Sequence, residues 1–202
     1  MSDLTRIQKL LALGLISLFS MAGYLAVSSG IAGLGFPLDD AWIHQVYARN
    51  LADSGKWFFS GAESSGGSTG QLWSAFLAVW YWLGISPLWG TYLWGWLLLW
   101  AVSGSVTLLY EVFPGGRTPA WGSLSAGAVT ALEWHLVWAA GSGMETLLYT
   151  FLVLVLLLMI LKTRTTPWWA AGALSGFCVW VRPGGITLLL VTGAAVVAEE
   201  RG

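Results

Sequence analysis

Long apolar runs alternate with short polar breaks along this chain. The runs cover residues 10–27, 72–83, 88–110, 120–138, 147–161 and 168–198. About 20 apolar residues cross the ~30 Å hydrocarbon core of a membrane as one α-helix. An open sheet would leave backbone groups unpaired in lipid, so helices are expected. The pattern predicts an all-α, polytopic transmembrane helical bundle of five to six spans, with a single domain over residues 1–202.

The composition supports a membrane protein. Only 9% of the residues are charged and 56% are hydrophobic, whereas soluble proteins average about 25% charged residues. No basic cluster indicates a nucleic-acid partner. The single cysteine, Cys178, lies inside an apolar run, so the chain has no disulfide framework.

The first apolar run sets the expected orientation. Arg6 and Lys9 precede it, and the positive-inside rule then predicts a cytoplasmic N-terminus. A cleavable signal peptide is the alternative, but the length of the run and the spans that follow favour an uncleaved first span. Residues 34–70 are therefore expected to form the first extracytoplasmic loop.

This outer segment carries an amphipathic pattern. It contains six of the 19 charged side chains: Asp39, Asp40, Arg49, Asp53, Lys56 and Glu63. The apolar residues that recur at helical spacing are Trp42, Ile43, Val46, Tyr47 and Leu51. On the other side of the same helix the pattern places His44, Gln45 and Arg49. The prediction is a juxtamembrane helix that lies on the membrane surface.

Two adjacent acids open this helix. Asp39 or Asp40 is suited to cap the N-terminus, and Gly55 is suited to end the helix. One aspartate would satisfy the cap, so the pair favours a functional role over capping alone. The polar loop at residues 60–70 that follows is expected to be flexible. It either closes over a ligand or serves as a plain connection.

The basic loops constrain the topology. Residues 72–83 are short and rich in tryptophan, which favours the membrane interface. If this piece is interfacial or re-entrant and only 88–110 crosses, then Arg117, Lys162 and Arg164 all fall on the cytoplasmic side. We prefer this arrangement. Residues 111–119 are then a cytoplasmic turn.

Later in the chain, ionisable residues flank or interrupt the apolar runs. Glu133 and His135 lie near the end of the 120–138 run, and solvation is the favoured interpretation of His135. Glu145 lies among small residues at a helix start, where capping and function are both open. The 168–198 run would measure roughly 46 Å as one helix. Because Arg182-Pro183-Gly184-Gly185 interrupts it, we expect a broken helix or a tight pair.

Arg182 is the remaining candidate. An arginine at membrane depth is costly and usually faces a cavity or an anion. Snorkelling of the side chain to the headgroups is the alternative.

Three motifs together resemble a known family. They are Leu38-Asp39-Asp40-Ala41-Trp42-Ile43 followed by Tyr47-Ala48-Arg49-Asn50-Leu51, then Ser142-Gly143-Met144-Glu145-Thr146, and then Val181-Arg182-Pro183-Gly184. In this order they look like the N-terminal portion of the GT-C glycosyltransferases, above all the bacterial arabinosyl and mannosyl transferases. These multi-spanning enzymes take sugars from polyprenyl-phosphate donors in the cell envelope.

The resemblance implies a function and a site. The chain would be an integral protein of the plasma (inner) membrane whose active loop is extracytoplasmic, and its partners would be a lipid-linked sugar donor and membrane lipid. Asp39 would be the catalytic base, with Asp40 beside it. Donor binding would fall to Arg182, Glu145, His44 and Arg49. A divalent cation, Mg²⁺ or Mn²⁺, would be held by Glu145 with Asp40 or Glu133, since oxygen ligands suit these ions. Transfer would invert the sugar.

The chain also departs from the family pattern. The family often has Arg-Pro-Glu-Gly where this chain has Arg182-Pro183-Gly184-Gly185, and usually Glu-Gly-Tyr-Thr-Ser near 66–70. It also has more helices, so the chain is interpreted as a fragment, half of a split enzyme or a reduced relative. Two rivals remain: a non-catalytic scaffold that packs its tryptophans against an additional membrane subunit, and a transporter. No inverted repeat supports the transporter.

Overall fold

The computed structural model describes residues 4–61, 63–112, 120–161 and 167–200, and its regular structure in these ranges is entirely helical. The all-α prediction is confirmed. Two helices are long and apolar enough to cross a membrane, α1 (Arg6–Ala32) and α4 (Pro87–Val112). The predicted turn at 111–119, with Arg117, and the basic residues Lys162 and Arg164 fall largely or wholly outside the described residues.

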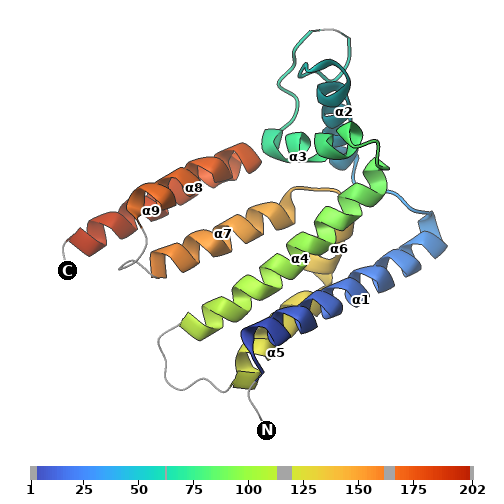
Figure 1. The fold of residues 1–202 in the computed structure, drawn as a ribbon. Coiled ribbons are helices and arrows are strands. Elements are labelled where there is room, and N and C mark those ends of the chain that lie inside the picture. The colour runs from blue at the N-terminus through green and yellow to red at the C-terminus, as the bar shows by residue number, and fades with distance from the viewer. Residues whose placement is uncertain (1–3, 62, 113–119, 162–166, 201–202) are drawn as a thin grey trace.

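The shorter helices complete the fold. They are α2 (Asp39–Ser54), α3 (Gln71–Trp82), α5 (Ala120–Leu132), α6 (Trp134–Gly141), α7 (Thr146–Leu161), α8 (Trp168–Val181) and α9 (Ile186–Glu200), with a 3₁₀ turn at Pro183–Gly185. The helices α1, α4, α5 with α6, α7, α8 and α9 run alternately in opposite directions, while α2 and α3 cover one end of the bundle (Figure 1). The α6–α7 and α8–α9 turns lie at this same end, which we call the α2–α3 end.

The two ends of α2 show one correct and one wrong prediction. Gly55 follows the helix in the left-handed conformation, with a φ of 67°, as expected. The N-cap, however, is Leu38, and no side chain caps the helix. Asp39 and Asp40 are instead its first two residues, where a carboxylate interacts favourably with the helix dipole.

The apolar pattern predicted one helix over residues 120–138, but the structure has two, α5 and α6. Glu133 adopts an extended conformation between α5 and α6, and its side chain accepts a hydrogen bond from the backbone N–H of Leu136 (3.0 Å). Glu133 therefore caps α6 and ends the preceding helix.

The last apolar block forms a pair of helices, one of the two predicted alternatives. Arg182 leaves the helical conformation, Pro183 begins the 3₁₀ turn, and α9 packs back on α8. A hydrogen bond between the hydroxyls of Ser175 and Thr192 (2.7 Å) joins the two helices.

Buried polar contacts hold α1 against its neighbours. The indole N–H groups of Trp96 and Trp100 donate to the carbonyls of Gly14 (3.1 Å) and Leu10 (2.8 Å). At the same N-terminal end of α1, the buried ammonium of Lys9 lies 2.8 Å from the Glu111 carboxylate of α4. A buried charge requires such a partner, so this ion pair fixes how the first helix meets α4.

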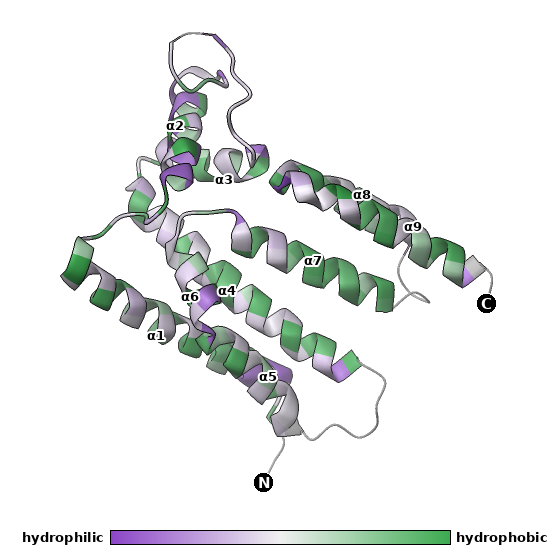
Figure 2. Ribbon diagram, turned by 180° about the vertical axis from the view of Figure 1, so that it is seen from behind, coloured by the Kyte–Doolittle hydropathy of each residue, from purple (hydrophilic) through white to green (hydrophobic). Residues whose placement is uncertain are grey.

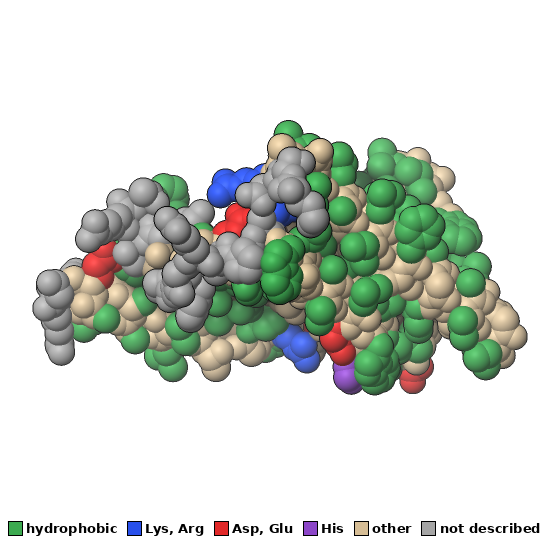
Figure 3. Space-filling view, turned by 90° about the horizontal axis from the view of Figure 1, so that it is seen from below, with side chains coloured by type: hydrophobic (Ala, Val, Ile, Leu, Met, Phe, Trp, Pro, Cys, Tyr) green, Lys and Arg blue, Asp and Glu red, His purple; other side chains and the backbone are tan. Residues whose placement is uncertain are grey.

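Hydrophobic surface dominates the bundle. Figure 2 shows hydrophilic residues gathered on α2 and the segment after it, whereas most of α7, α8 and α9 is hydrophobic. Hydrophobic side chains also cover much of the face seen from below (Figure 3). Exposed apolar patches of this extent mark contact with lipid or with other chains.

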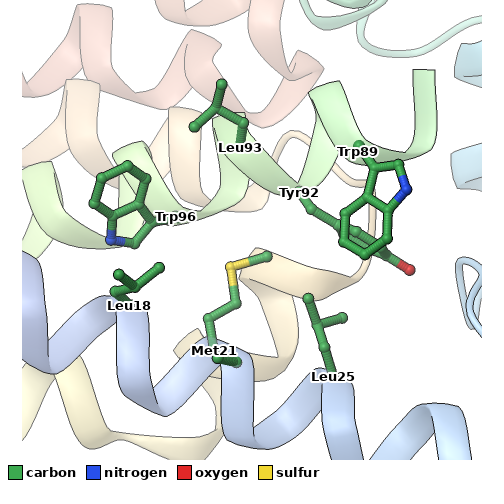
Figure 4. A pocket seen from close by; sticks show the side chains of 8 residues that line it. Leu18, Met21, Leu25, Trp89, Tyr92, Leu93 and Trp96 are labelled. Carbon is green, nitrogen blue, oxygen red and sulfur yellow. The ribbon is translucent and has the colours of Figure 1, made fainter. Parts of the chain in front are cut away.

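An apolar pocket of about 290 Å³ lies between α1 and α4 (Figure 4). Its lining consists of Leu18, Met21, Ala22, Leu25, Trp89, Tyr92, Leu93 and Trp96. Because this lining contains no charged side chain, it supplies no acid, base or phosphate ligand.

The packing of α4 on α6 depends on a glycine. A side chain at Gly95 would collide with the carbonyl group of Ala140. We expect Gly95→Ala to lower the free energy of unfolding by about 1–3 kcal/mol, the usual cost of overpacking. Gly23→Ala is the matched control, because nothing lies near a side chain there. Thermal unfolding in detergent checks this expectation, and equal melting temperatures of the two variants would contradict it.

Candidate functional site

Glu145 is the centre of a buried polar group at the α2–α3 end. It directly precedes α7 and is only 4% exposed. The turn before it is fixed by Gly143, whose φ of 80° and close contacts with Phe36 and Ala41 leave no room for a side chain. Trp73 donates its indole N–H to the Gly143 carbonyl (2.8 Å). Contacts from α2 and α3 therefore lock the position of this carboxylate.

His44 connects Glu145 to α3. Its Nε2 lies 3.4 Å from Oε2 of Glu145, and its Nδ1 hydrogen bonds with the hydroxyl of Ser74 (2.9 Å). The ring is 2% exposed. The sequence pattern placed His44 and Gln45 on the polar outer side of α2, and this was wrong. Both face the protein, and Gln45 is satisfied by a hydrogen bond to Thr91 (2.9 Å).

Arg182 reaches the same carboxylate from the α8–α9 turn. Its Nε lies 4.0 Å from Oε1 of Glu145, while 52% of its side chain remains exposed. A pocket of about 360 Å³ adjoins it, lined by Gln71, Val179, Trp180 and Pro183. The guanidinium therefore stands between a buried acid and an accessible pocket with a mainly apolar lining.

The environment keeps Glu145 ionised. Burial raises the pKa of its carboxyl group, but the close contact with His44 and the charge of Arg182 outweigh this, so the pKa lies below its ordinary value. The Oε2 atom is buried and accepts no well-aligned hydrogen bond among the described residues. This oxygen can therefore accept a further hydrogen bond.

The acidic pair lies at the same end, at the start of α2. Both carboxylates are exposed. Asp40 is four residues before His44 and so lies on the same side of the helix, whereas Asp39 is four residues before Ile43 and faces another side. Ala41 lies close to Gly143. The start of α2 is therefore seated against the turn that carries Glu145.

Arg49 and Glu133 do not join this group in any contact that the structure records. Arg49 is exposed on the outer side of α2. Glu133 is occupied at the α5–α6 break, where its carboxylate lies 2.6 Å from Nδ1 of the exposed His135. The exposed side chain of His135 leaves its predicted solvation an expectation.

The expected divalent-cation ligands are not gathered into a cluster in the part of the chain that the structure describes. Within the described ranges, no cluster of three or more His, Cys, Asp and Glu side chains is placed to hold a metal. Glu145 already faces two cationic or proton-donating groups, His44 and Arg182. The expected Mg²⁺ or Mn²⁺ ligands, Asp40 and Glu145, therefore lack a third protein ligand in these segments.

Sequence reasoning missed the two serines that complete the network. Ser68 and Ser74 hydrogen bond with each other (3.2 Å) and both lie near Nδ1 of His44. A serine, a histidine and a glutamate in series resemble the triad of a hydrolase. Ser74 is 0% exposed, so no substrate reaches its hydroxyl. No motif marked these serines, because only the fold brings Ser74 to His44.

Comparison with known protein families, curated proteins and solved structures finds no match to this chain. The functional assignment therefore rests on the residues and their geometry.

Proposed function

We propose that this chain is a membrane glycosyltransferase of the GT-C type. It would move a sugar from a polyprenyl-phosphate-linked donor to an acceptor hydroxyl at the outer face of the plasma membrane. In this arrangement α1, α4, α5 with α6, α7, α8 and α9 cross the bilayer as six spans, and the N-terminus is cytoplasmic. The α2–α3 end then faces outward and carries the site.

The position of Arg182 is the observation that carries the proposal. Its Nε lies 4.0 Å from the buried Glu145 carboxylate, yet about half of the Arg182 side chain stays accessible beside a pocket lined by Val179 and Trp180. A phosphate meets the exposed N–H groups in a charge-assisted contact, while the apolar lining suits the first units of a lipid tail. A lipid-linked phosphate combines these two properties in one molecule.

The proposed step uses Asp39 and Arg182. Asp39 accepts the proton of the acceptor hydroxyl as that oxygen attacks the anomeric carbon. The bond between this carbon and the phosphate oxygen breaks, and its electron pair leaves with the polyprenyl phosphate. Arg182 neutralises charge on the departing phosphate. Direct attack forms no covalent enzyme intermediate, so the anomeric configuration inverts.

Donor binding tests the proposal. We expect Arg182→Gln to weaken binding of a polyprenyl-phosphate sugar by roughly 10- to 100-fold, the value of one hydrogen bond to a charged group. The measurement is a titration of the protein in phosphatidylcholine nanodiscs with two donors. One is a short-chain polyprenyl phosphate that carries mannose, and the other carries arabinose.

Arg49→Gln is the matched control, since this exposed arginine lies on the outer side of α2 and outside the Glu145 group. Its affinity should equal that of the wild type. If neither donor binds the wild type, or if both variants weaken binding equally, the assignment of the donor site is wrong.

A further inference from the structure

A third pocket lies on α2, away from the Glu145 group. It has a volume of about 350 Å³ and is formed by one side of α2 and the segment after it. Its lining residues are Ile43, Tyr47, Phe59, Ser60, Ser65 and Gly67. We call it the α2–loop pocket. Nothing in the donor site described above uses it.

The segment that forms this pocket is anchored rather than free. The buried Tyr47 hydroxyl hydrogen bonds with the hydroxyl of Ser65 (2.7 Å) and accepts from the backbone N–H of Gly67 (2.9 Å). Asn50 donates to the carbonyl of Phe58 (2.8 Å). Within the predicted flexible loop at 60–70, Ser65 and Gly67 are therefore bonded to α2.

The aromatic rings of Tyr47 and Phe59 line the pocket. Tyr47 lies 5.0 Å from Trp57 and 6.1 Å from Phe59, measured between ring centroids. Phe59 is 45% exposed, although it stands in the most polar part of the chain. An exposed aromatic ring beside a pocket is available to a ligand.

Apart from Ile43, the remaining lining is polar. The side chains of Ser60 and Ser65 and the backbone at Gly67 add hydroxyl and peptide groups around the rings. A sugar ring has one face of C–H groups, which an aromatic face can cover, and an edge of hydroxyls, which serines can meet. The volume lies at the low end of the ~300–1,000 Å³ range of small-molecule sites. The pocket is thus suited to a single sugar unit.

The spacing of residues along α2 places the proposed base on the same side of the helix as this pocket. Asp39, Ile43 and Tyr47 are spaced by four residues and therefore share one side of the helix. Ile43 and Tyr47 line the pocket. Asp39 consequently stands one turn from the pocket, on its side of α2, while Asp40 stands on the side of His44.

We propose that the α2–loop pocket is the acceptor site and that the acceptor is a carbohydrate. The inference rests on the proposed function, because it places the hydroxyl that Asp39 deprotonates. The acceptor sugar packs on Phe59 and Tyr47, and the donor approaches from Arg182. Donor and acceptor thus enter from two sides of α2.

Saturation-transfer NMR tests the inference with defined probes. The protein in phosphatidylcholine nanodiscs is mixed with methyl glycosides of mannose, galactose, glucose and arabinose, and with an acetylated serine tripeptide. We expect saturation of the C–H protons on one face of a glycoside and none on the peptide. Phe59→Ala should weaken glycoside binding by about tenfold.

Three further variants sharpen the test. Ser60→Leu places a larger side chain in the pocket lining and should also weaken glycoside binding. A loss in both variants would show that misfolding of Phe59→Ala alone is not the cause. Trp82→Ala removes an aromatic ring that is also exposed but lies on α3, outside the pocket, and should leave the signal intact. Arg182→Gln should leave it intact as well, because the donor site is separate.

The outcomes separate the two proposals. Glycoside binding without any transfer from the donor would contradict the proposed function and leave the pocket assignment standing. Transfer by a protein whose Phe59→Ala and Ser60→Leu variants keep wild-type acceptor affinity would overturn the pocket assignment alone. Binding of the peptide in preference to every glycoside, or equal losses in Phe59→Ala and Trp82→Ala, would also overturn it.

Discussion

Asp39→Asn is expected to abolish sugar transfer, with a loss of about 100- to 10,000-fold in kcat, the range that general-base catalysis contributes. Asparagine has the shape of aspartate but its amide cannot accept the proton of the acceptor hydroxyl. The residue is the first of α2 and exposed, so the variant should fold and insert normally. The measurement is turnover of a polyprenyl-phosphate sugar in nanodiscs, with donor binding measured in parallel.

Two other variants of α2 serve as comparisons. Asp53→Asn removes an exposed acid at the far end of the same helix and should keep wild-type turnover. Asp40→Asn decides which acid is the base, because Asp40 lies on the His44 side of the helix. A large loss in Asp40→Asn with none in Asp39→Asn would move the base to Asp40. Unchanged turnover in both would contradict a catalytic role for the pair.

Glu145→Gln should have the second largest effect, on both stability and donor binding. It removes the anion that His44 and Arg182 share in a buried position. We expect the free energy of unfolding to fall by about 1.5–3 kcal/mol, the value of hydrogen bonds to a charged group. Arg182 also loses its anchor, so donor affinity should fall with it. Thermal unfolding and donor titration measure the two effects.

The pH dependence of stability provides a further check on the same residue. Because the pKa of Glu145 is lowered in the folded protein, the carboxylate stabilises the fold at pH values above the ordinary carboxyl pKa of about 4.3. This contribution disappears as the pH falls through the lowered folded-state pKa. The melting temperatures of wild type and Glu145→Gln should therefore differ at pH 7 and converge in acid.

Glu63→Gln is the control for this experiment, since Glu63 is an exposed acid of the polar segment. It should melt as the wild type does at every pH. If Glu145→Gln also melts like the wild type at pH 7, the buried ion pairs do not stabilise the protein.

Local chemistry made much of the secondary structure predictable. The apolar runs correspond to helices because a backbone in an apolar environment must satisfy its own hydrogen bonds. Gly55 ends α2 because only a residue without a side chain adopts its left-handed φ at no cost. Pro183 separates α8 from α9 because proline fits the first turn of a helix but not its interior.

Some local features escaped the pattern because two local signals competed. Glu133 looked like the edge of one long span, yet its side chain caps α6 and divides the run. The aspartates looked like caps, yet Leu38 takes that position. For α2 a difference of one residue in the helix start decides the outcome, and propensities alone do not resolve boundaries this finely.

The candidate residues were visible in the sequence as isolated ionisable groups in an apolar chain, because such groups are costly in a membrane unless they have partners. Their partners were not visible. The buried side of α2 follows from its packing on α3, which turns His44 inward and brings it to Ser74 and Glu145. Periodicity along one helix defines its faces, but only the neighbouring helices determine which face is covered and which distant charges meet there.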